Sequence, residues 1–303
     1  MGLLFLCLVV VVVHGLNVNL NVTVLADGLS WLENLSFGGA KGLFFTEALA
    51  SRVWHIPSPS ENFTLYLDLT KSFAMNRILG VSFHFGLEVL VGVGQFANGT
   101  NFMYTSAGEG SLQIVAILPK LGNGIGVHER TGLVYTAAEG SLFPTKSVGG
   151  VYQVDVKTGA VLTLADNLHT SDGLWIDQDR DLLYVGELFR YDVACWDISK
   201  QPPRFLGFLP GLQSGLLDDF TLNANGTSII GANWLFNRID VFPALPTNGT
   251  FAPSTLIPSE YLNHPTSARF GVAPFATKSL FVTEGNQFRA SGTKDRLLRF
   301  DFF

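Results

Sequence analysis

One segment pattern recurs along the chain at intervals of 43 to 49 residues, and this repeat constrains the fold more than any other feature. Each copy has polar or small residues followed by apolar ones, then a turn and a second apolar run. A repeat of this length with several short strands per unit is typical of propeller blades, because one four-stranded sheet cannot bury its faces alone. The copies contain Glu33, Gly80, Asn123, Asp172, Asp218 and Ser267. The sequence therefore predicts an all-β fold, a six-bladed β-propeller.

Other architectures fit the repeat less well. A helical solenoid would need long stretches in which apolar residues recur every 3.6 positions, and we find none. A β-sandwich, or two barrels whose segments are similar by chance, is the remaining alternative. No linker rich in Ser, Pro or charge divides the 303 residues, so we expect a single domain over residues 16–303.

The first residues have the pattern of a secretory signal. Residues 3–13 are an unbroken apolar run that is too short to span a bilayer. The run ends in Val13-His14-Gly15, residues of small or moderate size where a signal peptidase would cut. We expect a signal peptide over residues 1–15 and a secreted protein. The run lacks the Lys or Arg that usually precedes it, so a buried or anchoring first strand is the alternative.

Six Asn-x-Ser/Thr sequons agree with secretion in a eukaryote. Asn98, Asn225 and Asn248 each precede Gly, as in tight turns at exposed hairpin tips, and these three are the predicted glycosylation sites. The sequon at Asn34 lies beside Glu33, a candidate site residue. We therefore expect Asn34 to be unmodified.

The two ends of the predicted domain both read as strands. Residues 17–24 alternate polar and apolar side chains, and residues 296–303 are also strand-like. An unpaired edge strand invites aggregation. We expect the first strand to pair into the blade that holds the last one.

Charge restricts the partners. The net charge of -6 argues against nucleic acid, and no apolar run is long enough to span a membrane. A small molecule is the expected partner.

The repeat units resemble the blade starts of the gluconolactonase and regucalcin family, which are calcium-dependent lactonase propellers. The resemblance covers nearly all of the chain after residue 15, and its five pieces occur in order at matching intervals. It implies a calcium-dependent lactonase; the wider superfamily also includes paraoxonase-like and phosphotriesterase-like propellers. The pieces are Leu32-Glu33-Asn34-Leu35-Ser36-Phe37, Asn123-Gly124-Ile125, Ser171-Asp172-Gly173-Leu174, Asp218-Asp219-Phe220 and Ser267-Ala268-Arg269-Phe270-Gly271.

The resemblance also implies roles for single residues. Glu33 matches the metal-binding carboxylate of the first blade, and Asp218 matches a metal-binding aspartate that is also the favoured base or nucleophile. Asn123 matches an asparagine that contacts substrate in some members and the metal in others. The sequence departs from the family at Asp172, which stands where a metal-binding Asn is usual, and at Leu121, where some sugar lactonases carry Arg.

The chemistry of these residues also predicts a metal site, independently of the family resemblance. Glu33, Asn123, Asp172 and Asp218 supply only oxygen donors, which favour calcium or magnesium over zinc. Calcium is the expected cofactor, with magnesium, manganese and zinc as alternatives, and Asp219 is a candidate to orient the ligands. The competing interpretation is that Asn-Gly and Asp-Gly pairs only form turns.

Four glutamates follow the second apolar run of their units, at a shared position. No partner for them is visible in the sequence, so we expect them to be structural. They are Glu47, Glu139, Glu187 and Glu284.

These observations predict a secreted, metal-dependent hydrolase that opens a lactone. A bound cation can polarise a carbonyl, and a carboxylate beside it, here Asp218, can act as the base. Two alternatives stay open: a non-catalytic propeller in which the metal only ties the blades and the rim binds a protein or glycan, and an aryl or phosphotriester esterase that uses the same site.

Overall fold

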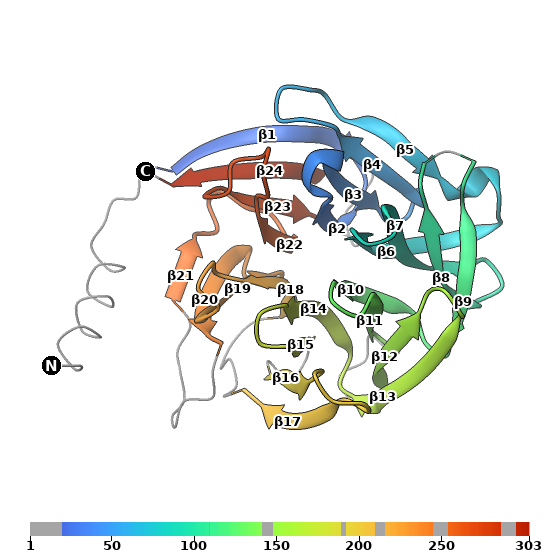
Figure 1. The fold of residues 1–303 in the computed structure, drawn as a ribbon. Helices are drawn as coiled ribbons and strands as arrows, with labels where there is room; N and C mark the ends of the chain where they lie inside the picture. The colour runs from blue at the N-terminus through green and yellow to red at the C-terminus, as the bar shows by residue number, and fades with distance from the viewer. Residues whose placement is uncertain are drawn as a thin grey trace, which may run out of the picture.

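The chain forms six four-stranded antiparallel sheets arranged around a central axis (Figure 1). The computed structural model describes residues 20–108, 110–140, 148–188, 192–209, 216–244, 254–285 and 295–302. The prediction of an all-β, six-bladed β-propeller is confirmed. The predicted signal over residues 1–15 lies outside the described residues.

Each of the first five blades uses four consecutive strands, numbered outward from the axis. Blade 1 also carries the short 3-10 turn η1 (Gly39–Lys41), and a second one, η2 (Leu69–Lys71), lies between blades 1 and 2. The strands of blades 1 to 3 are β2 (Leu32–Phe37), β3 (Leu43–Glu47), β4 (Arg52–Ile56), β5 (Thr64–Asp68), β6 (Met75–His84), β7 (Val89–Phe96), β8 (Asn101–Ser106), β9 (Gln113–Leu118), β10 (Gly122–His128), β11 (Leu133–Ala138), β12 (Gly149–Asp155) and β13 (Ala160–Leu168). Those of blades 4 and 5 are β14 (Ser171–Asp177), β15 (Leu182–Glu187), β16 (Asp192–Asp197), β17 (Arg204–Phe208), β18 (Leu217–Leu222), β19 (Ser228–Asn233), β20 (Arg238–Pro243) and β21 (Ser254–Ile257).

Blade 6 joins the two ends of the chain. It contains β22 (Pro265–Phe270), β23 (Leu280–Glu284), β24 (Asp295–Phe302) and, outermost, β1 (Leu20–Leu29). β1 pairs antiparallel with β24, from Leu20 opposite Phe302 to Leu29 opposite Asp295, and the two strands run side by side in Figure 1. The expected pairing of the first strand into the last blade is confirmed. It covers an edge of β24 that would otherwise be open.

The apolar core is divided among the interfaces between blades. Six large clusters of buried side chains each draw on two neighbouring blades, as side chains alternate between the two faces of a sheet. Between blades 3 and 4, for example, Tyr135 packs with Leu174, Val185 and Trp196. Every blade therefore needs both neighbours to bury its faces.

The innermost strands share an irregularity that positions the candidate site. In five of the six blades, two consecutive residues near the start of the inner strand oppose one residue of the next strand, as in a β-bulge. In β2, for instance, Leu32 pairs with Glu47 and the next paired residue is Leu35, so Glu33 and Asn34 form the bulge. The first bulge residues of blades 1 to 5 are Glu33, Leu79, Asn123, Asp172 and Asp218.

Glycine is the second bulge residue in three blades because the next blade approaches closely there. A Cβ on Gly124 would lie 2.3 Å from the Asp172 carbonyl oxygen, and one on Gly173 would lie 2.3 Å from that of Asp218. Asn123-Gly124 and Asp172-Gly173 lie inside β10 and β14. The interpretation of these pairs as turn formers is therefore wrong, and contact between blades explains their glycines.

Candidate active site

The bulges bring the four sequence-predicted donors to one end of the axis. Glu33, Asn123, Asp172 and Asp218 come from four blades and are all buried, with Asp218 the most exposed at 8%. The Asn123 amide donates to Glu33 across the ring with an Nδ2–Oε1 distance of 2.9 Å. Asp172 and Asp218 lie near these groups, because the charge of Glu33 contributes to raising the pKa of both aspartates and the charge of Asp172 also raises that of Asp218.

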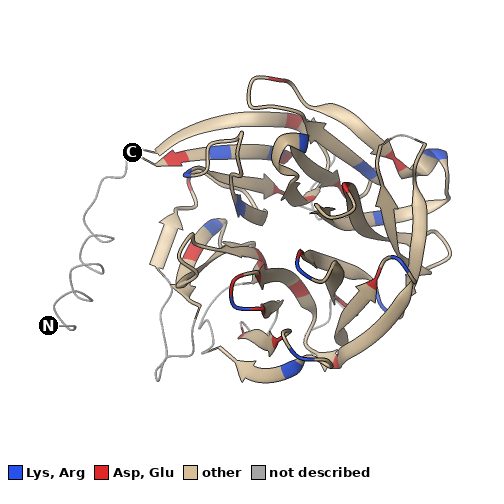
Figure 2. Cartoon of the chain, viewed as in Figure 1, with Lys and Arg blue, Asp and Glu red and all other residues tan. Residues whose placement is uncertain are grey.

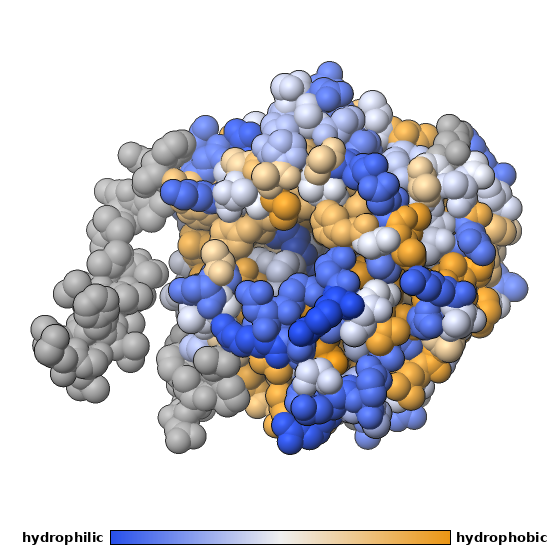
Figure 3. Space-filling view, in the orientation of Figure 1, coloured by the Kyte–Doolittle hydropathy of each residue, from blue (hydrophilic) through white to orange (hydrophobic). Residues whose placement is uncertain are grey.

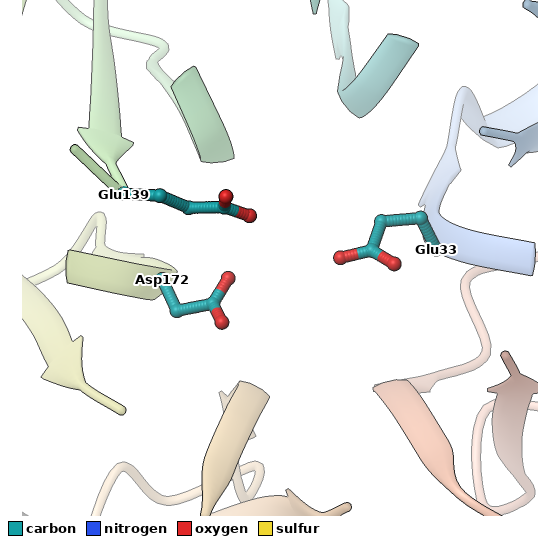
Figure 4. A group of neighbouring side chains, drawn as sticks. All are labelled: Glu33, Glu139 and Asp172. Carbon is teal, nitrogen blue, oxygen red and sulfur yellow. The ribbon is translucent and has the colours of Figure 1, made fainter. Parts of the chain in front are cut away.

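Glu139 joins this group from the end of β11. Glu33, Glu139 and Asp172 each place one carboxylate oxygen within 4.8 Å of the corresponding oxygens of the other two, and Figure 4 shows the three groups pointing toward each other. Asn123 Nδ2 also donates to Glu139 Oε1 at 2.9 Å, so one amide fixes two of the carboxylates. We call Glu33, Glu139 and Asp172 the carboxylate cluster.

The sequence singled out Glu139 only as one of four equivalent glutamates. Two of the others meet local partners: Glu47 accepts from Ser30 and Trp54, and Glu284 forms an ion pair with Arg296. Glu139 instead faces the axis. The sequence showed that the four glutamates share a position in their blades. It did not show that their surroundings differ.

Burial and mutual repulsion disfavour the ionised forms in this region. Burial raises the pKa of Glu33 to about 7; the Asn123 hydrogen bond opposes this shift, and the charge of Glu139 adds to it. Burial and neighbouring carboxylates raise the pKa of Asp172 and of Asp218 well above the ordinary aspartate range. Burial likewise raises the pKa of Glu139. A cation among these groups would favour their charged forms.

The donor set fits a hard divalent cation. Calcium binds oxygen ligands at about 2.3–2.6 Å, so two ligands of one ion lie at most about 5 Å apart. The 4.8 Å limit on the cluster satisfies this requirement. The donors are carboxylates and an amide, which suits calcium or magnesium, whereas zinc is usually held by His or Cys.

Asp219 follows Asp218 directly but has a different environment. Its carboxylate accepts hydrogen bonds from Asn34 Nδ2 at 3.0 Å, Ser267 Oγ at 2.7 Å and the Leu174 backbone N–H at 3.3 Å. Arg269 Nη2 lies 2.5 Å from Asp219 Oδ2. These contacts tie blades 1, 4, 5 and 6 together at the axis.

Arg269 is a buried residue whose role was not apparent from the sequence. It reaches from β22 to Asp219, donates to the carbonyls of Phe220 and Ala268, and places its guanidinium 5.1 Å from the centre of the Trp175 ring. The segment that contains Arg269 was recognised in the sequence as a repeat unit. Its partner Asp219, however, lies 50 residues away in another blade. We call Asp219 and Arg269 the central ion pair.

An apolar cluster lies beside the carboxylate cluster. Leu79, the first bulge residue of blade 2, packs with Trp31, Ala48 and Leu121. Trp31 also donates its indole N–H to Glu33. Some sugar lactonases of the resembling family carry Arg at the position of Leu121. Here that position belongs to the apolar cluster, which we call the apolar wall.

The predicted glycosylation sites differ in exposure. Asn98 and Asn225 are exposed in turns, and Asn248 lies outside the described residues. Asn34 is only 1% exposed, and its amide is bonded to Asp219. The structure thus provides a reason for the expectation that Asn34 is unmodified, while glycosylation itself stays a prediction.

The opposite end of the axis is mainly apolar. The far ends of the inner strands line a pocket of about 330 Å³ that includes Phe37, Phe83, Val127 and Ile176. Figure 3 shows a hollow at the centre of the ring. The same strands therefore carry acidic groups where they begin and apolar groups where they end.

The charged residues seen in Figure 2 are spread around the ring, with both signs interspersed. Among the described residues, no helix has the length and apolar character needed to cross a membrane.

Comparisons with solved structures identify the fold. The chain superimposes on the Xanthomonas campestris gluconolactonase XC5397 with a TM-score of 0.69 and 16% identity, covering 94% of this chain and 90% of that one. For a luciferin-regenerating enzyme the values are 0.72 and 13%, with 93% and 95% covered. For the calcium-binding protein regucalcin from Agrobacterium tumefaciens they are 0.63 and 15%, with 89% and 90% covered. No protein-family model matches the sequence, and no curated protein matches it. The chain thus has the fold of the gluconolactonase, luciferin-regenerating enzyme and regucalcin propellers.

Proposed function

We propose that the protein is a divalent-metal-dependent hydrolase that opens a lactone. The observation that carries this proposal is the carboxylate cluster: three buried acidic groups that each place one oxygen within 4.8 Å of the other two. The structural similarity to a gluconolactonase and to a calcium-binding regucalcin supports it. Because propellers host many functions, the argument rests on the site and not on the fold alone.

Glu33, Glu139 and Asp172 would hold the cation, with calcium as the best fit to an all-oxygen donor set. Asp218 and the Asn123 carbonyl oxygen are further candidate ligands. When bound, the cation would polarise the lactone carbonyl and stabilise the negative charge that develops on its oxygen.

Asp218 is the proposed base. It lies outside the group of three, and a cation in the carboxylate cluster would favour its ionised form, which is the form that accepts a proton. Asp218 would take a proton from the attacking water while the water oxygen bonds to the carbonyl carbon. The acyl C–O bond then breaks, the ring oxygen receives the proton, and the product is a hydroxy acid.

The surrounding residues would orient this chemistry. Asn123 holds two carboxylates through one amide, and the Trp31 indole holds Glu33. The apolar wall of Trp31, Leu79 and Leu121 favours a lactone with an apolar ring over a polyhydroxylated sugar lactone.

The direct test is hydrolysis of aliphatic, aromatic and sugar lactones, with aryl and phosphotriester esters included to detect an esterase. We expect lactone turnover with calcium, loss of turnover with a chelator, and loss of turnover in Asp218→Asn while the fold is retained. Asp179→Asn, at an exposed turn position, is the matched control and should retain activity. Calcium binding without turnover of any substrate would instead favour a non-catalytic propeller.

We also propose, from the sequence alone, that the protein is secreted and acts on a small molecule rather than nucleic acid. Amino-terminal sequencing of protein recovered from the medium of expressing cells should give residue 16 as the first residue. An intact residue 1 would contradict the predicted cleavage.

A further inference from the structure

We propose that a pocket between blades 2 and 3 binds a small carboxylate anion. The pocket has a volume of about 240 Å³ and is lined by Arg77, Gln95, Asn101, Lys120, Leu121 and Glu139. Glu139 also belongs to the carboxylate cluster, so the pocket adjoins the candidate active site. If the proposed function holds, the anion is the hydroxy acid that lactone opening produces.

The sheet register brings the polar groups of blade 2 together. Arg77 on β6 is opposite Gln95 on β7, and Gln95 is in turn opposite Asn101 on β8. Gln95 Nε2 donates to Asn101 Oδ1 at 2.9 Å, which holds the two amides in place. Lys120 follows β9 on the way to the next blade. A row across three strands and the following connection thus forms one wall of the pocket.

Arg77 has unused hydrogen-bonding capacity at this wall. Its Nε atom is buried and has no hydrogen-bond partner among the residues that the structure describes. A buried donor without an acceptor is unfavourable, and a guanidinium matches the two oxygens of a carboxylate in a planar, bidentate arrangement. The charge of Arg77 also lowers the pKa of Glu33 and of Glu139, so the guanidinium lies near the carboxylate cluster.

Lys120 adds a second positive charge that is already held in position. Its Nζ donates to the backbone carbonyl oxygens of Asp166 at 2.5 Å and Gly149 at 3.2 Å. An ammonium has three N–H donors, so one remains for a ligand. With Arg77, Lys120 and Glu139 as its charged lining residues, the pocket has a net charge of +1.

This charge distribution fits the product of the proposed reaction. A lactone is neutral, whereas the hydroxy acid is an anion at neutral pH that the acidic groups at the axis would repel. The pocket offers that anion two cations next to Glu139. A cation in the carboxylate cluster would offset the charge of Glu139, so calcium should strengthen anion binding, and the anion should strengthen calcium binding by the same factor.

Calorimetric titration with acetate and with γ-hydroxybutyrate tests the pocket. We expect saturable binding of both to the calcium-loaded full chain and weaker binding after chelation. A hydrogen bond to a charged group contributes about 1.5–3 kcal/mol, so Arg77→Leu should weaken binding by about 10-fold to 100-fold. Lys120→Met should weaken it less, and Lys200→Met, at an exposed bend, should not change it. Equal affinities in the wild type and Arg77→Leu would overturn the proposal.

Two further measurements distinguish the anion site from a damaged cation site and from the proposed lactonase function. A calcium titration of Arg77→Leu shows whether any loss of anion affinity follows from a damaged cation site, and Lys120→Met provides a second variant in the pocket. Arg77-dependent acetate binding in a protein without lactone turnover would support the anion site but overturn its assignment to the product. Lactone turnover without anion binding would overturn the anion site and leave the proposed function intact.

Discussion

Two groups of buried charges share the propeller axis, and their environments differ. In the central ion pair, Asp219 meets Arg269 at 2.5 Å and accepts three further hydrogen bonds. In the carboxylate cluster, acidic groups face one another, and amide and indole groups are the hydrogen-bond donors to them within the described part of the chain. A balanced group of buried charges can hold the blades together. A group of acidic residues without a counter-charge is unfavourable until a cation binds, which is the property expected of a metal site.

The contrast is sharpest between two consecutive residues. Asp218 and Asp219 form the bulge of β18, and the bulge directs one toward the acidic groups and the other toward Arg269. A regular strand would have placed them on opposite faces of the sheet. A single dipeptide therefore supplies both a candidate functional carboxylate and a structural one.

The largest expected effect is from removal of Arg269. Arg269→Met would leave Asp219 buried without its counter-charge, and breaking a buried ion pair in this way typically costs about 3–5 kcal/mol. Denaturant unfolding measures the loss. Arg204→Met, at a largely exposed arginine, is the control and should change stability little. A loss below about 1 kcal/mol in Arg269→Met would remove the distinction between the two charge groups.

The second prediction concerns the pH dependence of the metal-free protein. The pKa of Glu33 is raised from 4.5 to about 7, so the folded protein retains a proton that the unfolded chain releases. This group therefore favours the folded state below pH 4.5, and the advantage disappears as pH rises to about 7. The loss is about 3 kcal/mol at 1.36 kcal/mol per pKa unit.

Unfolding curves of the chelator-treated wild type and Glu33→Gln between pH 4 and pH 8 check this prediction. The stability difference between the two proteins should shift in favour of the variant as pH rises, and calcium should restore the wild type at neutral pH. A difference that stays constant across this range would show that Glu33 ionises normally in the fold.

A third prediction tests how the carboxylates are held. Asn123→Ala removes the amide that bonds Glu33 and Glu139 but leaves every acidic group in place. Residues that orient metal ligands typically contribute about 10-fold to 100-fold in metal affinity, and we expect a loss of calcium affinity in this range. Calorimetry compares the variant with Asn98→Ala, an exposed asparagine in a turn. Unchanged affinity would exclude Asn123 from the site.

The smallest effect should come from Asn34. Asn34→Ala removes one of several hydrogen bonds to Asp219, so a loss of about 1 kcal/mol or slightly more is expected, against almost none for Asn98→Ala. Glycopeptide mapping offers a second readout: Asn98 and Asn225 should carry glycans and Asn34 should not. Full occupancy at Asn34 is incompatible with its place beside the central ion pair.

The sequence predicted the repeating architecture better than the contacts across the axis. The spacing of the bulge segments predicted six blades, and the alternation in residues 17–24 predicted the closure by β1. Both are local signals, because blade period and strand alternation are properties of consecutive residues.

The contacts across the axis have no comparable local signal. Glu33 and Asn123 are 90 residues apart, and Arg269 and Asp219 are 50 residues apart in neighbouring blades. Glu139 could not be separated from Glu47 or Glu284, because the partners that distinguish them come from other strands. Residue type and position within the repeat were enough to predict four donors from the sequence. The fifth, Glu139, could be recognised only from the three-dimensional arrangement of the blades.

A calcium titration of chelator-treated protein tests the central claim most directly, since that claim is that the unbalanced carboxylates at the axis form a divalent cation site. The account predicts saturable binding of one ion per chain, and binding that is strongly weakened in Glu33→Gln but retained in Arg204→Met. An absence of saturable calcium binding to the folded wild-type protein, or equal affinity in the wild type and Glu33→Gln, would contradict it.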